Sequence, residues 1–226
     1  MTGSYRAVIF DLDGVLWDGE PLYHEAFNVV LKPLGHSIAL TDPAYVQIIG
    51  KSVEAAWEWM RERFALTDSP TMFYRAYDDA VMELMKKPLE PLPGVRELLD
   101  ELKARGIAVG LASASLRNWV DATLAGLGLN GAFAATMTAS EVERSKPAPD
   151  LYLKTAKQLG VPPGNCLAFE DTPSGIASAR GAGMFAVQVR ASSTALPPLP
   201  EADLVIESYA EFDLFLLDAA KREMKP

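Results

Sequence analysis

The stretch YRAVIFDLDGVL, residues 5–16, decides how the rest of the chain is interpreted. Its apolar run at 7–10 predicts a buried strand, because a short β-branched and aromatic run that ends at a turn residue is typical of a central strand in a parallel sheet. Asp11 and Asp13 come directly after this run. Residues i and i+2 of an extended segment point the same way, so we expect the two carboxylates to project together from the end of this strand.

This acidic pair indicates a cation. Two carboxylates side by side repel each other unless a cation or a shared proton relieves the repulsion. Ligands of open α/β sheets lie at the carboxyl ends of the strands, and a hard divalent ion such as Mg²⁺ prefers oxygen ligands. A bare DxDG is also a common turn, in which Asp11 acts as a cap and Asp13 with Gly14 bends the chain. The choice between a Mg²⁺ site and a turn therefore depends on the residues later in the sequence.

Length and charge narrow the class of protein. The chain has 226 residues, enough to bury a substantial core, and a formal net charge of −9. Nucleic-acid and anionic-membrane partners need a basic face, and the sequence has no basic cluster. Cys166 is the only cysteine, which excludes an intramolecular disulfide and suits a reducing compartment. No apolar run approaches membrane-spanning length, so the sequence predicts a soluble, cytoplasmic protein with nothing that demands more than a monomer.

Strand and helix patterns alternate from residue 95 to the end of the chain. Strands are expected at 107–112, 133–137, 166–170, 185–189 and 204–206, and helices at 95–105, 116–127, 150–159, 174–180 and 211–224. This alternation implies βαβ units and a parallel sheet. The predicted fold class is therefore α/β, with a Rossmann-like parallel sheet core made of residues 1–17 and 88–226.

Residues 18–87 carry helical patterns alone and separate the first predicted strand from the others. Apolar residues recur at helical spacing at 22–34, 44–49, 53–64 and 72–85. We expect this block to form an inserted helical cap domain, with its aromatic residues in the interior of a small bundle rather than around a pocket.

Three further predicted positions carry chemistry suited to a phosphate. Ser113 follows the strand at 107–112, where its hydroxyl and the neighbouring backbone N–H groups could hold a phosphate. Lys146 stands in SKPAPD, residues 145–150, where a fixed ammonium could neutralise a transferring phosphoryl group. Glu170 and Asp171 end the strand at 166–170 and add acid to a site that would already hold two aspartates. Such crowding is hard to explain without a metal ion.

Two nucleotide-binding patterns fail on context. GLGLNG at 126–131 matches G-x-G-x-x-G but comes after a predicted helix instead of a strand, so it indicates a helix end and loop. GKS at 50–52 resembles the end of a P-loop, yet Tyr45 occupies the position of the first glycine.

Four segments together resemble a known family. DLDGVL at 11–16, LASAS at 111–115, SKPAPD at 145–150 and FEDTPSGI at 169–176 are similar to the four motifs of the haloacid dehalogenase superfamily of phosphohydrolases, in order and across the whole predicted core. The helical block directly after the first motif is most similar to the β-phosphoglucomutase-like phosphatases.

The resemblance implies roles for these residues. Asp11 would be the nucleophile that forms an aspartyl-phosphate, and Asp13 would protonate the leaving oxygen and later activate water. Ser113, with the adjoining Ala114, and Lys146 would grip the phosphoryl oxygens. The Mg²⁺ ligands would be Asp11, the backbone carbonyl of Asp13 and Asp171, with Glu170 close by.

The cap residues bear on the substrate. In the resembled family the cap closes over the active site, and His24 sits where the mutases carry a histidine that assists proton transfer. Lys51 lies in the cap loop that dips towards the nucleophile, Glu20 is a candidate for the substrate pocket, and Arg75 could approach a second phosphate. An ordinary structural role is the more common explanation for three of these residues: a place on a helix face for His24, and a solvated surface charge for Lys51 and Arg75.

Three functions stay open at this level. The first is a Mg²⁺-dependent phosphatase for small phosphomonoesters, with sugar phosphates favoured. The second is a hexose-phosphate mutase, disfavoured because Val53 occupies the position of an arginine that grips the non-transferred phosphate. The third is a non-enzymatic phospho-sensing protein, which leaves Asp13 and the inserted cap unexplained. The sequence does not identify the phosphorylated metabolite.

Overall fold

The computed structural model describes residues 5–43, 45, 48, 53–67, 69–192 and 195–217. The chain divides into two compact units, one of Met1–Asp18 with Leu89–Pro226 and one of Gly19–Pro88. We refer to them as the core and the cap and describe each by itself.

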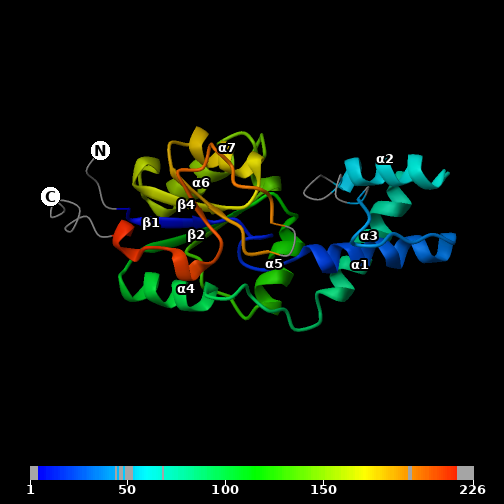
Figure 1. Cartoon of the computed structure of the whole chain (residues 1–226), viewed down its shortest axis with the longest axis horizontal. Helices are drawn as coiled ribbons and strands as arrows, with labels where there is room; N and C mark the ends of the chain where they lie inside the picture. The colour runs from blue at the N-terminus through cyan, green and yellow to red at the C-terminus, as the bar shows by residue number, and fades with distance from the viewer. Residues whose placement is uncertain are drawn as a thin grey trace. The chain divides into compact units, whose positions relative to one another are not determined.

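Six parallel strands form the sheet of the core, in the order β3-β2-β1-β4-β5-β6. The strands are β1 (Ala7–Phe10), β2 (Ala108–Ser113), β3 (Ala135–Thr138), β4 (Cys166–Glu170), β5 (Phe185–Val189) and β6 (Leu204–Ile206). β1, drawn in blue, lies between β2 and β4, with Phe10 opposite Leu111 on one side and Phe169 on the other (Figure 1). In parallel strands the carboxyl ends share one edge, so this register places the residues after β1, β2 and β4 side by side.

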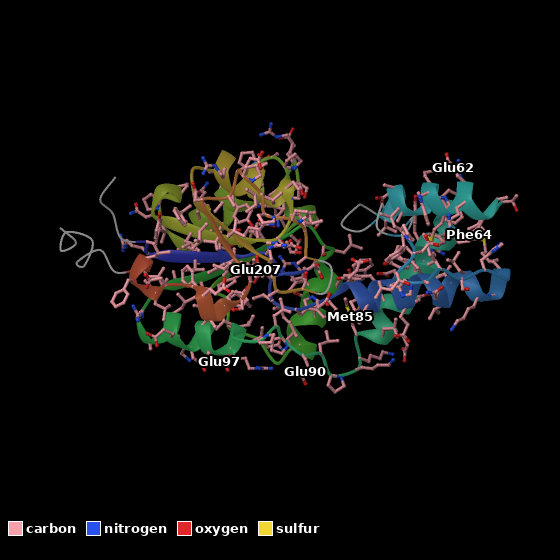
Figure 2. All side chains as sticks on the ribbon, viewed as in Figure 1. Glu62, Phe64, Met85, Glu90, Glu97 and Glu207 are labelled. Atoms are coloured by element: carbon pink, nitrogen blue, oxygen red, sulfur yellow. The ribbon has the colours of Figure 1, made fainter. Side chains whose placement is uncertain are left out.

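Helices cover both faces of this sheet (Figure 1). α4 (Val95–Ala104) and α5 (Arg117–Gly126) lie on one face, and α6 (Asp150–Leu159) and α7 (Pro173–Gly181) lie on the other. Since both faces are covered, all four residues of β1 are buried, and the rings of Phe10 and Phe169 stack with centroids 5.1 Å apart. In Figure 2 the exposed Glu97 points away from α4, on the side opposite the sheet. The predicted α/β fold class with a parallel sheet is confirmed.

The end of the chain differs from the prediction. A closing α-helix was expected at 211–224, but the described residues form two short 3-10 turns, η5 (Tyr209–Glu211) and η6 (Leu214–Leu217). Acidic side chains accept backbone N–H groups here: Glu211 Oε2 accepts from Glu207 N (2.9 Å) and Asp213 Oδ1 from Phe215 N (2.9 Å). Such local side-chain bonds compete with helical hydrogen bonds. Residues beyond 217 lie outside the described part of the chain.

The described elements of the cap are all helical. The cap contains α1 (Glu20–Leu31), η1 (Lys32–Leu34), α2 (Val53–Phe64) and α3 (Pro70–Leu84). Its interior is aromatic: the rings of Phe27 and Tyr77 stack with centroids 4.2 Å apart, and those of Trp57 and Phe73 pack at a tilt with centroids 4.5 Å apart. The helix predicted at 44–49 falls largely outside the described residues. Among the residues that the structure does describe, none of the helices has the length and apolarity needed to cross a bilayer.

Helix α2 has one exposed side and one side that packs against the rest of the cap. Glu62 is exposed and points away from the cap bundle, whereas the ring of Phe64 stacks on that of His36 with centroids 4.8 Å apart (Figure 2). The packed aromatic side of the cap helices therefore agrees with the apolar stripes in the sequence.

Candidate active site

The turn after β1 presents the two predicted aspartates. The Asp11 backbone N–H donates to Phe169 O (2.9 Å), which continues the pairing of β1 with β4 by one residue. The chain then turns at Gly14, whose φ of +76° lies in the left-handed region that favours glycine. Asp11 is 8% exposed and Asp13 is partly exposed. Strand pairing thus holds Asp11, the candidate nucleophile, in a buried position at the carboxyl end of β1.

The end of β2 meets this turn through Ser115. The Ser115 hydroxyl donates to Asp13 Oδ2 (2.8 Å), and its backbone N–H donates to Ser113 Oγ (3.0 Å). Ser113 is 1% exposed, whereas the intervening Ala114 is exposed. On the other side of Asp13, the indole N–H of Trp17 donates to Oδ1 (3.1 Å). Both oxygens of the Asp13 carboxylate therefore accept hydrogen bonds.

Lys146 lies between two buried carboxylates. Its Nζ is 2.6 Å from Asp11 Oδ1 and 2.5 Å from Glu170 Oε1, and the three side chains are 6%, 11% and 0% exposed, respectively. The Tyr152 hydroxyl donates to the same Glu170 oxygen (2.7 Å). Burial by itself would lower the pKa of Lys146, but the carboxylates of Asp11 and Glu170 raise it above its ordinary value. Lys146 therefore stays protonated in the site.

The loop that carries Lys146 is fastened on both sides. At its start, Glu141 forms a capping box with Thr138 and pairs with Arg117 at the beginning of α5. At its end, the Ser178 hydroxyl of α7 donates to Ala148 O (2.6 Å). These bonds place a loop lysine, which strand register alone cannot position, against the ends of β1 and β4.

The carboxylates at this edge fit a hard divalent cation. Asp11, Glu170 and Asp171 each offer an oxygen, and these oxygens lie within 4.8 Å of one another. Asp171 Oδ1 is buried and has no hydrogen-bond partner among the residues that the structure describes. A Cβ on Gly14 would lie 2.1 Å from Asp171 Oδ2, so only glycine leaves room for this carboxylate. An all-oxygen, anionic donor set of this kind suits Mg²⁺.

The pKa values of the carboxylates also indicate a site for a cation. Burial, together with Glu170 and Asp13, raises the pKa of Asp11 from 3.8 to about 7, although Lys146 opposes the shift. Burial and then the charges of Glu170 and Asp11 raise the pKa of Asp171 well above its ordinary value. The single positive charge of Lys146 thus does not balance the negative charges of Asp11, Glu170 and Asp171. A bound cation would reduce the repulsion between these carboxylates.

The structure brings the predicted core residues to one edge of the sheet: Asp11, Asp13, Ser113, Lys146, Glu170 and Asp171. Sequence reasoning missed Trp17, Ser115 and Tyr152. Ser115 lies two residues after Ser113, and that spacing could have singled it out. Tyr152 carries no such signal, because its contact with Glu170 arises between α6 and β4.

The predicted cap residues have contacts of their own within the cap. Glu20 Oε1 accepts the Tyr45 hydroxyl (2.7 Å), and His24 Nε2 lies 2.8 Å from Ile38 O. The His24 ring also packs edge-on against Tyr45, with centroids 5.0 Å apart. Arg75 is exposed on α3, and Lys51 lies outside the described residues. The roles predicted for these residues in substrate binding stay predictions.

The fold and the site define a class of protein. One edge of the parallel sheet carries an acidic pair, a buried lysine, a serine and a second acidic pair. Phosphoryl transfer requires these groups, and the protein is of the phosphohydrolase class. The chain belongs to the haloacid dehalogenase-like hydrolase family, whose model matches residues 5–183. The resemblance seen in the four motifs is thereby confirmed.

Two relatives and one solved structure illustrate the similarity. The chain is 36% identical over 194 residues to the fructose-1-phosphate phosphatase YqaB of Escherichia coli, covering 84% of this chain and 99% of that protein. It is 32% identical over 219 residues to the β-phosphoglucomutase of Bacillus subtilis, covering 94% and 93%. The crystal structure of CbbY from Rhodobacter sphaeroides in complex with phosphate matches with a TM-score of 0.80 and 26% identity, over 95% of this chain and 99% of that one. Membership of this hydrolase family shows that the protein is an enzyme, so the prediction of a non-enzymatic phospho-sensing protein is wrong.

Proposed function

We propose that the protein is a Mg²⁺-dependent phosphatase that hydrolyses small phosphomonoesters, sugar phosphates above all, through an aspartyl-phosphate on Asp11. The observation that carries this proposal is the Asp11 carboxylate, buried at the end of β1, 2.6 Å from the Lys146 ammonium and two residues from Asp13. The similarity to a fructose-1-phosphate phosphatase supports a sugar phosphate as substrate.

The first half-reaction forms the intermediate. An oxygen of Asp11 attacks phosphorus, the bond from phosphorus to the ester oxygen breaks, and the leaving oxygen takes a proton from the Asp13 carboxyl. Lys146 neutralises charge on the phosphoryl oxygens. Ser113 Oγ accepts the Ser115 N–H, so its own proton can be donated to a phosphoryl oxygen. When bound by Asp11, Asp171 and the Asp13 backbone carbonyl, with Glu170 beside them, Mg²⁺ supplies further positive charge against the transferring group.

The second half-reaction restores the enzyme. A water molecule gives a proton to Asp13 as its oxygen attacks the phosphorus of the aspartyl-phosphate, and the bond between phosphorus and Asp11 breaks. Inorganic phosphate leaves, and Asp13 again carries the proton that the next cycle needs. Asp13 thus serves as acid in one step and base in the next, which is why its orientation matters.

A screen of phosphorylated metabolites with and without Mg²⁺ tests this proposal. We expect phosphate release in the presence of Mg²⁺ and a loss of about 1,000-fold or more for Asp11→Asn, because the nucleophile is removed. Asp100→Asn, an exposed aspartate on α4, is the matched control and is expected to keep full activity. Full Mg²⁺-dependent activity of Asp11→Asn would rule the proposal out.

A mutase is the second candidate, supported by the similarity to a β-phosphoglucomutase. In the mutases that the sequence resembles, the cap loop carries an arginine for the non-transferred phosphate, and the resemblance places Val53 at that position here, which favours hydrolysis. Incubation of β-glucose 1-phosphate with a bisphosphate primer separates the two. Isomerisation of the sugar phosphate would support the mutase, and release of free phosphate alone supports the phosphatase.

A further inference from the structure

The Asp13 carboxylate is held by two donors of different kinds. Its Oδ1 accepts the indole N–H of Trp17 at 3.1 Å, and its Oδ2 accepts the Ser115 hydroxyl at 2.8 Å. An indole nitrogen can only donate, whereas a hydroxyl can donate or accept. The two oxygens of Asp13 are therefore not equivalent: Oδ1 must remain an acceptor while the Trp17 bond stands, and Oδ2 can carry a proton if the Ser115 hydroxyl turns.

Trp17 is rigidly placed for this contact. It is 3% exposed, and its backbone forms bridges with Asp13 and with Pro91. Its carbonyl oxygen also accepts the Gly14 N–H at 2.9 Å, which closes the turn after β1. The indole therefore cannot follow a rotation of the Asp13 side chain, and it holds that side chain in one orientation.

We propose that Trp17 is a positioning residue for proton transfer. Its indole N–H fixes the orientation of the Asp13 carboxyl and makes Oδ2 the oxygen that exchanges the proton, while the Ser115 hydroxyl switches between donor and acceptor. The inference rests on the proposed function, in which Asp13 protonates the leaving oxygen. It extends that function to a residue that acts through Asp13.

The alternative is that Trp17 only fills space under the turn, and the leaving group distinguishes the two roles. A sugar alkoxide needs a proton to leave, whereas p-nitrophenolate leaves without one. The value of kcat/KM reports the steps up to release of the alcohol, so the ratio of kcat/KM for a sugar phosphate to that for p-nitrophenyl phosphate measures acid catalysis. A purely structural role of Trp17 would lower both values together and leave the ratio unchanged.

The test compares Trp17→Phe with the wild-type protein on p-nitrophenyl phosphate and on the sugar phosphate that the screen turns over fastest. We expect the ratio to fall by about 10-fold or more, and by at least as much for Asp13→Asn, since general acids contribute about 100-fold to 10,000-fold. Trp57→Phe is the matched control, because Trp57 is fully buried and the described part of the chain offers its indole N–H no hydrogen-bond partner. This control is expected to leave the ratio unchanged.

A second variant tests the same role of Trp17 if Trp17→Phe does not fold. Replacing Trp17 with 3-benzothienylalanine keeps the shape of the indole but has sulfur in place of the N–H, and the same fall in the ratio is expected. An unchanged ratio in this variant, with a reduced ratio in Asp13→Asn, would overturn the role of Trp17 and leave the phosphatase proposal intact. Retained activity of Asp11→Asn would instead overturn the phosphatase proposal itself.

Discussion

Removing the ammonium of Lys146 should destabilise the protein strongly when no metal is bound. Among the residues that the structure describes, Lys146 is the only cationic side chain paired with Asp11 or Glu170, at 2.6 and 2.5 Å. Glu170 is fully buried and Asp11 nearly so. Truncating one partner of a buried ion pair costs about 3–5 kcal/mol, because the remaining charge has no partner. Lys146→Met leaves Glu170 without its cation. Asp11, whose pKa is already raised to about 7 while Lys146 opposes the shift, becomes protonated in this variant, so we expect a loss within that range and not above it.

Urea unfolding followed by circular dichroism, in the presence of EDTA, measures this loss. Lys157→Met, at an exposed position of α6, is the matched control and should change the free energy of unfolding by less than about 0.5 kcal/mol. In the double variant Lys146→Met with Glu170→Gln, one buried charge disappears together with the ammonium. We expect this variant to regain about 1–3 kcal/mol relative to Lys146→Met, since residues in contact couple by such amounts.

Two results would refute this reasoning. One is a free energy of unfolding for Lys146→Met within about 1 kcal/mol of the wild type, which would mean that water or rearrangement already compensates the carboxylates. The other is a double variant less stable than Lys146→Met. In that case Glu170 would stabilise the fold through its bond with Tyr152, irrespective of charge.

Two further predictions concern the geometry of single residues. Gly14→Ala forces a left-handed φ of +76° on alanine and places its Cβ 2.1 Å from Asp171 Oδ2. We expect about 1–2 kcal/mol of destabilisation and at least about a 10-fold loss of Mg²⁺ affinity by calorimetric titration, and unchanged affinity would contradict the assignment of Asp171 to the metal. Burial raises the pKa of the Cys166 thiol from 9.0 to about 11. The folded protein therefore keeps a proton that the unfolded chain releases, and stability that is complete below pH 9 falls as the pH rises to 11, by about 3 kcal/mol. Unfolding curves of Cys166→Ala should lack this loss, and parallel pH dependence of the two proteins would refute it.

The parts that sequence reasoning predicted correctly are those with a local physical signal. The buried run at 7–10 is the central strand β1, because a strand covered on both faces must be apolar throughout. The prediction of a closing helix at 211–224 was wrong in the described part of that segment. The hydrophobic periodicity contains no information on the hydrogen bonds that Glu211 and Asp213 accept from nearby backbone N–H groups. The predicted roles of the site residues stay predictions, although the core residues among them lie at one edge of the sheet.

The sequence by itself determined the α/β fold and the adjacent Asp11 and Asp13, because strand burial and the two-residue spacing are properties of a short segment. Only the tertiary structure decided which groups meet across the sheet edge. Lys146 lies 135 residues from Asp11 along the chain and contacts it within hydrogen-bond distance. Ser115, which follows β2, is 102 residues from Asp13 along the chain and donates its hydroxyl to that carboxylate. Distances between such groups depend on strand order and loop packing, and no local pattern of residues encodes them.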